Sequence, residues 1–580
     1  MSDFWGFDTE TVNRTGNGQA CLLVTGQTPD KIAHHEFPRH FSDVFDILAA
    51  KPRRKHVAYH MDFDARAIVH PAFMPWKTIE KVGLFGRATW SKYSFHYIPT
   101  KFLEVQRADG RGFVLFDTKQ FFGMGLRAAL ERYAPHIPKG DIPQSWYDEM
   151  DLCLLDHRRD VALAYARRDV EGLLYLTNDV LLKSLAGLNI RPRRLSSCAS
   201  LARLRYGKRL AQVRAPDYVN DMFQRSFYGG RIECNTLGRV GACKLYDINS
   251  AYPSVIAKLL NPSTGIHLEF EGESWRWKNP HYGLYLVEAD IPRGELYGPL
   301  AVRQGGKVFY PVGRVKTWCG VAGIECLRRH RFKFKVRWCY EIFDCKELIF
   351  DDIEALFLRR KDSSIGLAIK LLLNSIYGLF AEATNYLTED PCSTRVLSGC
   401  HVAARSTYGR YTNFVLASHI TESVRIKVYE VMRSAGARAH FAATDGVLVD
   451  SSYDLPTGPG LGEWGLKGLY ECGTVLGCGR YELTAPVGKP DVIHLRGFPV
   501  SRAAFEKLAV SKRSFAWINQ LDTPSLRQWA GDGLIDSLNV LTPHKHRLEV
   551  GDDKRAWPKR YRRVCDYFHG SMRSMPYIVG

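Results

Sequence analysis

The sequence lacks the features that mark several protein classes. No run of 18 or more apolar residues occurs among its 580 residues, so no transmembrane helix is predicted. The opening stretch MSDFWGFDTETV has acidic residues where a secretory signal needs a basic and then an apolar segment. The 14 cysteines include no C-x-x-C pair, which argues against a zinc ribbon or a small disulfide-rich domain. We therefore expect a soluble cytoplasmic protein that does not span a membrane.

Acidic residues are outnumbered, with 61 Asp and Glu against 80 Lys and Arg, and the formal net charge is +19. Because the excess is spread along the whole chain, a large polyanion is the leading partner, ahead of an acidic membrane surface. Internal repeats, heptad runs and low-complexity tracts are absent as well. A chain of this length is expected to form about three to four domains, and local breaks in the pattern place boundaries near residues 190 and 500.

Two carboxylates lie close together at the N-terminus. DFWGFDTETV is rich in aromatic and β-branched residues and predicts a strand, in which the period of two puts Asp8 and Glu10 on one face. Such a pair repels itself unless a cation lies between the carboxylates, and divalent ions prefer oxygen ligands. An exposed pair on an edge strand is the alternative.

Two further segments carry acidic residues in an informative order. HVAYHMDFDAR (56–66) contains Asp64, and LAYARRDVEGL (163–173) contains Tyr165 and Asp169, which share a face of a helix. With Asp8 and Glu10, these segments resemble the three exonuclease motifs of the DEDDy 3′–5′ exonucleases found at the N-terminus of family B DNA polymerases. The resemblance implies that the carboxylates hold two Mg²⁺ or Mn²⁺ ions and that Tyr165 orients the attacking water. It also implies DNA contacts by two residues of the second motif, His60 and Phe63, although His60 replaces the Asn that is usual in the family.

The segment LYDINSAYPSVI (245–256) reads as a strand that ends near Asp247 and a helix that opens with Tyr252 and Pro253. A plain strand-to-helix turn is the alternative. The segment resembles the first polymerase motif of family B DNA polymerases. The resemblance implies that Asp247 and the backbone carbonyl of Ile248 hold metal ions. It also implies that Tyr252 packs under the sugar of the incoming nucleotide and excludes a 2′-hydroxyl, so that the substrate is a dNTP.

A strongly apolar helix is predicted from IGLAIKLLLNSIYGLF (365–380), and its nearly continuous apolar surface predicts burial on all sides. Lys370, Asn374 and Tyr377 form one narrow stripe on it, and a buried lysine is rarely structural. The stripe resembles the K-x-x-x-N-S-x-Y-G motif of the family's fingers, which implies contacts to the triphosphate, the nucleotide and the nascent base pair. Upstream, one of Arg359, Arg360 and Lys361 is expected to make a second phosphate contact, with solvated helix-end charges as the alternative.

The segment HFAATDGVLVDSS (440–452) predicts a hairpin with a type I′ turn centred on Asp445 and Gly446. Its order and spacing resemble the third polymerase motif, in which a hairpin carries D-T-D. Asp445 matches the second Asp of that motif, which implies that it holds the metal ions together with Asp247. Ala443 takes the place of the first Asp, and a reduced rate or an altered metal preference is expected from this change.

Further nucleic-acid contacts are implied by two segments. FYGGR (227–231) resembles the Y-x-G-G turn between exonuclease and polymerase domains, which implies DNA contacts by Tyr228, Gly229, Gly230 and Arg231. CGRYELTAP lies where the family grips the primer end, and Arg480 and Tyr481 are the residues available there. A Gly-Gly hairpin without a DNA contact is the alternative for the first segment.

The resemblance covers almost the whole chain and is strongest to the small, protein-primed subfamily of phages and linear plasmids. It implies an α/β multidomain fold in which an RNase H-like exonuclease domain precedes a right-hand polymerase. The expected divisions are an exonuclease domain (1–188), palm (189–262), a palm insertion like a terminal-protein region (263–350), fingers (351–381), an inserted β element (382–412), palm (413–500) and a basic thumb (501–580).

The resemblance also implies the partners, which are a DNA template and primer, dNTPs and a terminal priming protein. It implies a monomer in the cytoplasm of a bacterium or an infected host cell. Two alternatives stay open: a 3′–5′ exonuclease whose polymerase half only binds DNA, because of Ala443, and a catalytically silent nucleic-acid-binding protein. The second alternative would require both acidic sets to be without function.

Overall fold

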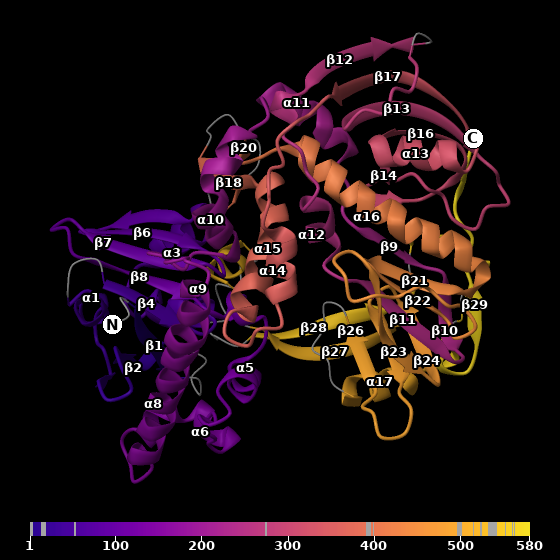
Figure 1. The fold of residues 1–580 in the computed structure, drawn as a ribbon. Helices are drawn as coiled ribbons and strands as arrows, with labels where there is room; N and C mark the ends of the chain where they lie inside the picture. The colour runs from indigo at the N-terminus through magenta and orange to yellow at the C-terminus, as the bar shows by residue number, and fades with distance from the viewer. Residues whose placement is uncertain are drawn as a thin grey trace.

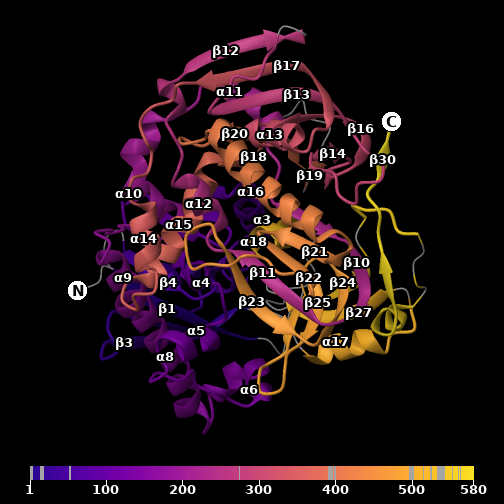
Figure 2. The same cartoon turned by 45° about the vertical axis from the view of Figure 1, so that its right-hand side comes forward.

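The computed structural model describes residues 4–12, 19–50, 54–272, 275–389, 396–397, 400–495, 502–513, 515–522, 525–531, 542–551, 553–558, 561 and 563–580. Within these ranges, no helix has both the length and the hydropathy needed to cross a membrane. Figures 1 and 2 show an N-terminal unit beside a larger body, with helices between them.

The N-terminal unit is built on an eight-stranded sheet with the strand order β3-β2-β1-β4-β8-β7-β6-β5. Its centre is parallel, because β4 pairs in parallel with both β1 and β8, and the other pairings are antiparallel. The strands are β1 (Phe4–Thr11), β2 (Ala20–Gly26), β3 (Ile32–Glu36), β4 (Arg54–Ala58), β5 (Arg87–Trp90), β6 (Tyr93–Ile98), β7 (Phe102–Arg107) and β8 (Gly112–Asp117).

Helices cover parts of both faces of this sheet. The longest, α8, lies so close to β1 that a Cβ atom on Gly6 would come within 2.9 Å of Val170. A π-helical stretch (Leu176–Leu182) follows it. The helices are α1 (Phe41–Leu48), α2 (Met61–Ile68), α3 (Trp76–Phe85), α4 (Lys119–Phe122), α5 (Leu126–Tyr133), α6 (Gln144–Asp148), α7 (Met150–Cys153), α8 (Arg159–Tyr175) and α9 (Lys183–Ala186).

The larger body contains two five-stranded antiparallel sheets, ordered β23-β11-β22-β21-β9 and β26-β25-β24-β10-β29. The long helix α16 packs against the first sheet and is capped by Asn413, whose side chain accepts a hydrogen bond from the Leu416 N–H. The elements are β9 (Arg231–Cys234), β10 (Thr236–Val240), β11 (Cys243–Ile248), α12 (Ala251–Ile256), α16 (Phe414–Ala435), β21 (Ala439–Thr444), β22 (Gly446–Asp450), β23 (Trp464–Tyr470), β24 (Cys472–Gly477), β25 (Arg480–Thr484) and β26 (Val492–Leu495).

A third five-stranded sheet, ordered β12-β17-β13-β16-β30, forms the top of the molecule in Figure 1. Its strands come from the stretch 263–350 apart from the short C-terminal β30. The elements of this part are β12 (Ile266–Glu271), β13 (Tyr282–Ile291), β14 (Val302–Gln304), β15 (Lys307–Phe309), β16 (Val312–Cys319), α13 (Val321–Arg329) and β17 (Lys333–Phe343).

Four further helices and a further β element belong to this part of the molecule. Within the segment 382–412, β18 pairs antiparallel with β20. The elements are α10 (Cys198–Gln212), α11 (Asp217–Phe223), α14 (Ile353–Arg359), α15 (Gly366–Phe380), β18 (Ala383–Glu389), β19 (Val396–Leu397) and β20 (Cys400–Tyr408).

The C-terminal part differs from the single thumb expected for 501–580. It begins with a long hairpin, but the last residues return to the larger body, where β29 pairs with β10 and β30 pairs with β16. The fully buried Arg555 holds this return in place, because its guanidinium donates to Glu233 at 2.9 Å. The elements are α17 (Arg502–Ala509), β27 (Phe515–Asp522), α18 (Leu526–Gly531), β28 (Thr542–Glu549), β29 (Ser571–Arg573) and β30 (Ile578–Val579).

The connection between β27 and β28 reaches the N-terminal unit. Its helix α18 packs on α3, and Trp529, only 1% exposed, stacks on His70 and meets the edge of Trp76 with ring centroids 5.1 Å apart. The approach is close, because a Cβ atom on Gly83 would lie 2.4 Å from the Leu526 carbonyl oxygen. The hairpin and the N-terminal sheet are therefore joined by a packed interface.

Candidate active sites

Strand pairing brings Asp247 and Asp445 together. Asp247 lies near the end of β11 and pairs with Gly446 on β22, while the Ile248 N–H donates to the Asp445 carbonyl at 3.0 Å. Burial, and then the negative charge of Asp247, raise the pKa of Asp445 to about 6. The cation nearest to the pair is Lys467 on β23, with its Nζ 3.2 Å from Asp247. Two carboxylates thus converge at one end of a sheet.

The turn that carries Asp445 differs from the expected one. Ala443 pairs with Gly446, so the central residues are Thr444 and Asp445, and not Asp445 and Gly446. Thr444 has a φ of +64°, whereas Gly446 keeps a negative-φ strand conformation because it belongs to the ladder with β11. The Asp445 N–H donates to the Ala443 carbonyl at 2.8 Å, which closes a three-residue γ-turn centred on Thr444. The expected type I′ turn was therefore wrong.

A positive φ costs free energy in a β-branched residue such as Thr444. The neighbouring Gly230, which lacks a side chain, leaves the space that this turn occupies. A Cβ atom on Gly230 would lie 2.6 Å from Thr444 Cγ2 and 2.9 Å from Thr444 Cα. Gly229 has open space at the same position. Gly230 thus packs its backbone directly against the turn that holds Asp445.

The other residues of this Gly-Gly segment are not placed for DNA contact. Tyr228 is 4% exposed and lies between the guanidiniums of Arg303 and Arg425. Arg231 is fully buried, pairs with Glu233 and lies over the ring of Tyr310 at 3.9 Å. The DNA contacts expected of Tyr228 and Arg231 disagree with this burial, because neighbouring side chains enclose both residues.

Ala443 lies on the other side of the hairpin from α16, in a partly apolar cluster with Tyr481 and Cys478. Tyr481, on β25, stacks on Phe441 with ring centroids 5.0 Å apart and on His494 at 5.5 Å. Arg480 precedes it and is half-buried. The primer contacts expected of Arg480 and Tyr481 stay predictions.

The helix α15 is not buried on all sides, and that part of the prediction was wrong. It buries a broad apolar face against α10, α12, α14 and α16, but Lys370 and Asn374 are exposed. The stripe is therefore open, as a nucleotide contact requires. Tyr377 closes one end of it, with its ring centroid 4.7 Å from that of Tyr252. Burial, and then Asp445, raise the pKa of Tyr252, which places its ring beside the carboxylates.

Of the two arginines before this helix, only Arg360 contacts the turn that follows Asp247. Its Nη1 donates to Ser250 Oγ at 3.1 Å, and its guanidinium lies 4.1 Å from the centre of the Phe357 ring. Arg359 is exposed at the end of α14. Arg360 is thus the better placed of the two.

The N-terminal unit holds a second set of carboxylates. Asp8 and Glu10 share a face of β1, Asp64 comes from α2 and Asp169 from α8. The Thr9 hydroxyl donates to Asp64 at 2.8 Å. Burial and the neighbouring carboxylates raise the pKa of Asp8 to about 8 and that of Glu10 and Asp64 well above the ordinary value.

Sequence reasoning missed the cation of this site. Lys139 donates to Asp169 and, at 3.3 Å, to the Tyr165 hydroxyl, and its ammonium lies 5.1 Å from the centre of the Tyr165 ring. It comes from the connection between α5 and α6, and no periodic pattern marks it. The Oδ1 atom of Asp169 is buried and has no hydrogen-bond partner among the described residues.

A pocket of about 230 Å³ opens onto these residues, lined among others by Asp8, Tyr59, His60, Lys139 and Asp169. His60 has a φ of +76°, and its N–H donates to Asp117 at 3.3 Å. Burial lowers the pKa of His60 to about 4. His60 is therefore a neutral group at the mouth of the pocket.

The neighbouring residues of α2 have different surroundings. Phe63 is half-buried, which leaves part of its ring free for a ligand. Asp62, to which the sequence assigned no role, is buried and accepts from the Tyr97 hydroxyl at 2.7 Å and from the Thr100 N–H. Asp62 thus anchors α2 to the neighbouring strands.

Comparisons with known proteins agree with this arrangement. The family described as DNA polymerase type B, organellar and viral, matches residues 162–396. A probable DNA polymerase of Ascobolus immersus is 24% identical over 239 residues, which is 36% of this chain and 20% of that protein. The chain thus matches about a fifth of the length of this curated relative.

Solved structures extend the similarity to nearly the whole chain. Phi29 DNA polymerase complexed with primer-template DNA and incoming nucleotide substrates has a TM-score of 0.65 at 13% identity, covering 94% of this chain and 100% of that one. Phi29 DNA polymerase complexed with single-stranded DNA has a TM-score of 0.64 with the same identity and coverage. The chain therefore shares its mixed α/β multidomain fold with Phi29 DNA polymerase, and its resemblance to the family B DNA polymerases is confirmed.

Proposed function

We propose that this protein is a DNA-dependent DNA polymerase that adds dNTPs to a primer 3′-hydroxyl and removes misplaced nucleotides with a 3′–5′ exonuclease. The convergence of Asp247 and Asp445 through the pairing of β11 with β22 is the observation that carries the proposal. Each residue comes from a motif that resembles the family's metal-binding motifs, and the motifs lie 198 residues apart in the chain.

The surroundings of both carboxylate sets fit divalent ions. Burial raises the pKa values of Asp445 and Asp8, and so does the charge of a neighbouring carboxylate in each site, Asp247 or Asp169. A bound cation would relieve this repulsion. The unpartnered Oδ1 of Asp169 is a further free ligand atom among the described residues. Asp247, Asp445 and the Ile248 carbonyl would hold two Mg²⁺ or Mn²⁺ ions, and Asp8, Glu10, Asp64 and Asp169 two more. Such ions, when bound, activate the attacking oxygen and stabilise the leaving one.

The residues around Asp247 and Asp445 form a nucleotide site. Tyr252 and Tyr377 present adjoining rings, and the first ring would lie against the sugar, where its bulk excludes a 2′-hydroxyl. Lys370 and Asn374 point out of α15 on the exposed stripe, where they would bind the phosphates and the nucleotide. Arg360 would add a second phosphate contact.

In the N-terminal site, Tyr165 would orient the attacking water. Lys139 holds the Tyr165 hydroxyl and Asp169 in place, because its ammonium donates to both. Burial raises the pKa of Asp169, and the charge of the Lys139 ammonium opposes that rise. His60 and Phe63, at the mouth of the pocket, would contact the single strand that enters.

The partners, the cellular setting and the domain roles complete the proposal. The partners are a DNA template and primer, dNTPs and a terminal priming protein, and the protein acts as a monomer in the cytoplasm of a bacterium or an infected host cell. The exonuclease domain comprises 1–188, and the insertion at 263–350 and the β element at 382–412 are candidate sites for the priming protein and the template. The thumb is limited to α17 and the hairpin of β27 and β28, with α18 in its connection.

Primer extension tests the polymerase proposal. With a 5′-labelled primer on a defined template and Mg²⁺ or Mn²⁺, the wild type should extend the primer and Asp445→Asn should not. Asp454→Asn is the matched control, because the Asp454 side chain is 85% exposed and pairs only with Lys244 among the described residues. Equal extension by wild type and Asp445→Asn would overturn the proposal, and intact exonuclease without extension in the wild type would favour the exonuclease alternative.

Degradation of a single strand tests the exonuclease. A 3′-labelled oligonucleotide should be degraded by the wild type and persist with the Asp8→Ala, Glu10→Ala double variant. The double variant Asp46→Ala, Asp109→Ala removes two carboxylates of the same domain that are half-exposed and pair with Arg107. It should degrade the oligonucleotide normally, and degradation by the first double variant would remove the assignment.

Initiation needs a separate experiment. The protein is offered dNTPs and template without primer, with and without a candidate terminal protein from the same genome. Covalent labelling of the terminal protein by a radioactive dNTP would support protein priming. Synthesis only from an annealed oligonucleotide would limit the protein to nucleic-acid primers.

A further inference from the structure

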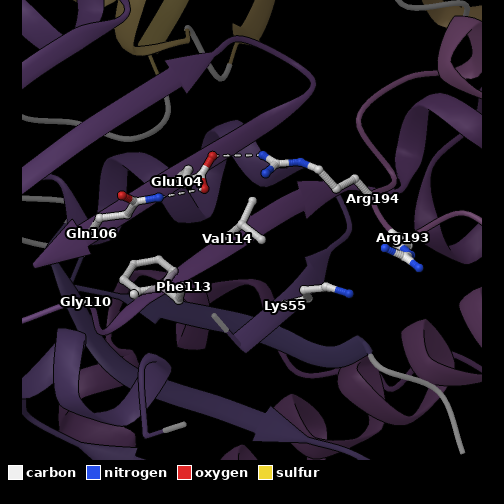
Figure 3. Close-up of a pocket in the computed structure, with 9 residues that line it drawn as sticks. Lys55, Glu104, Gln106, Gly110, Phe113, Val114, Arg193 and Arg194 are labelled. Carbon is white, nitrogen blue, oxygen red and sulfur yellow. Dashed lines mark hydrogen bonds and ion pairs between the residues drawn. The ribbon is translucent and has the colours of Figure 1, made fainter. Parts of the chain in front are cut away.

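A depression lined by basic side chains lies on the N-terminal unit, apart from both carboxylate sets. Two adjoining cavities, of about 620 and 460 Å³, lie over β5, β6, β7 and β8 and share Glu104 and Gln106. Together they form a surface that we call the sheet groove, defined by Lys55, Arg87, Glu104, Gln106, Arg193 and Arg194. Figure 3 shows the larger cavity.

The lining is strongly cationic. Four basic side chains, Lys55, Arg87, Arg193 and Arg194, line the two cavities against the single carboxylate of Glu104, which leaves a net charge of +3. Burial, and then the charge of Arg87, lower the pKa of the neighbouring His96, so its ring is neutral at pH 7. The groove is therefore complementary to a polyanion.

The groove is also a built surface rather than a set of loose side chains. Arg194 donates to Glu104 at 2.9 Å, and its guanidinium lies 5.2 Å from the centre of the Phe102 ring. Gln106 in turn donates to Glu104 at 3.2 Å, and Figure 3 shows this chain of contacts across the cavity. The strands thus hold one arginine and one amide in fixed positions.

The floor of the larger cavity is closed. Phe113 and Val114 of β8 line this cavity, but they are only 2% and 6% exposed, and as consecutive strand residues they point to opposite faces of the sheet. The groove therefore suits the phosphate backbone of a single strand, because positively charged grooves track such strands. Each cavity has the size of a site for a small molecule, which suits a nucleotide and not a double helix.

The sheet groove is distinct from the pocket at Asp8. Lys55 on β4 lines the groove and Tyr59, just past the end of that strand, lines the pocket; the two residues are four positions apart, roughly 13 Å at the usual rise of a strand. Between them, Val57 and Phe116 are completely buried in the core. No continuous channel joins the two sites through this core.

We propose that the sheet groove is a second nucleic-acid-binding site, which holds a single strand of DNA outside both active sites. The inference goes beyond the proposed function and does not require it, because binding there involves neither metal ions nor dNTPs. Strand separation during synthesis would supply such a single strand.

Binding of a labelled oligonucleotide tests the proposal. Fluorescein-labelled (dT)₂₀ is titrated with the full-length protein in EDTA, in the presence of an excess of an unlabelled blunt hairpin that occupies the duplex-binding surface. The groove variant is Arg87→Ala, Arg193→Ala, with one substitution in each cavity. Both side chains are exposed, so the fold should persist. The matched control is Lys31→Ala, Lys77→Ala, which removes two exposed charges elsewhere on the same unit.

Loss of two phosphate contacts should reduce the slope of log K against log salt concentration by about 1.4, which weakens binding about 25-fold at 0.1 M salt. The control should bind like the wild type, and Arg87→Lys, Arg193→Lys should retain most of the affinity. The proposal is overturned if the groove variant binds like the wild type, or if the control loses as much. Unchanged (dT)₂₀ binding together with lost binding of a poly-glutamate peptide would instead assign the groove to an acidic protein partner.

Primer extension on a duplex whose template has a single-nucleotide overhang separates this proposal from the function proposed above. The groove variant should extend such a primer normally. A protein without any extension activity would contradict the polymerase proposal and leave the binding result as it stands.

Discussion

The substitution Gly230→Ala should disable DNA synthesis and spare the exonuclease. The new methyl group would lie 2.9 Å from Thr444 Cα and 2.6 Å from Thr444 Cγ2, whereas carbon atoms need about 3.5 Å. A side chain can rotate away, but a Cα atom cannot. The turn that carries Asp445 must therefore move by about 0.6 Å or more.

Two consequences should be measurable. Overpacking of this kind costs about 1–3 kcal/mol of stability, which chemical denaturation followed by tryptophan fluorescence would detect. A displacement approaching 1 Å at a catalytic group lowers rates by as much as 100-fold, so single-turnover addition of one dNTP should slow by about 10- to 100-fold. Degradation of a 3′-labelled strand, measured on the same preparation, should be unchanged.

Gly229→Ala is the matched control. A Cβ atom on Gly229 meets no heavy atom within 4 Å, and its φ is not in the left-handed region, so a methyl group fits without movement. Its single-turnover rate should equal that of the wild type once DNA binding is saturated. If Gly230→Ala also adds nucleotides at the wild-type rate, the contact with Thr444 does not position Asp445 and the reasoning fails.

Three other perturbations have defined outcomes. Lys139→Met should slow the exonuclease by about 100-fold without changing primer extension, because Tyr165 and Asp169 lose the group that holds them; equal single-strand degradation by variant and wild type would contradict this role. Trp529→Ala should cost about 3–5 kcal/mol at the contact of α18 with α3, measured by urea denaturation, because this side chain is 1% exposed; a loss below about 1 kcal/mol would mean that the interface is not packed in solution. In EDTA, the stability of the N-terminal unit should fall as the pH rises from about 4 to 8. Asp8 has a pKa of about 8 in the folded protein and keeps its proton over this range, whereas the unfolded chain releases that proton above the ordinary pKa of 3.8. Mg²⁺ should reverse that fall, and a flat profile in thermal melts would show that the carboxylates are not coupled to folding.

Much of the arrangement of the candidate active sites could be predicted because the motifs are local. Asp8 and Glu10 share a strand face, and Tyr165 and Asp169 share a helix face, so the periodicity of each element fixes their relation. The union of Asp247 with Asp445 came from resemblance, and the pairing of β11 with β22 accounts for it. Local patterns and order in the chain therefore sufficed for these residues.

The missed features depend on contacts between distant segments. Gly446 was assigned to the turn because Asp-Gly is a strong local turn signal, but a third strand, β11, recruits it into the ladder. Arg231 was expected to contact DNA because FYGGR resembles the Y-x-G-G turn of the family, yet Glu233 and Tyr310 contact its buried guanidinium. Lys139 carries no pattern at all, since only the fold brings its loop to Asp169.

The exposed stripe on α15 shows a limit of composition. A helix with so many apolar residues is predicted to be buried all round, but burial also depends on how many neighbours are available. Packing partners cover one broad face, and the side with Lys370 and Asn374 has none among the described residues that bury it. In this helix, the two polar residues therefore predict the exposed side better than the apolar residues predict the buried side.

The strained turn at Thr444 also sets how this protein would respond to artificial selection. A residue with a positive φ and a branched Cβ costs of order 1–3 kcal/mol, and glycine or asparagine would relieve part of that cost. A library screened only for heat resistance should therefore accumulate substitutions at position 444, whereas a library screened for DNA synthesis should retain threonine if the rigid turn matters for Asp445. Comparing the two libraries at this one position would reveal whether stability and catalysis compete there.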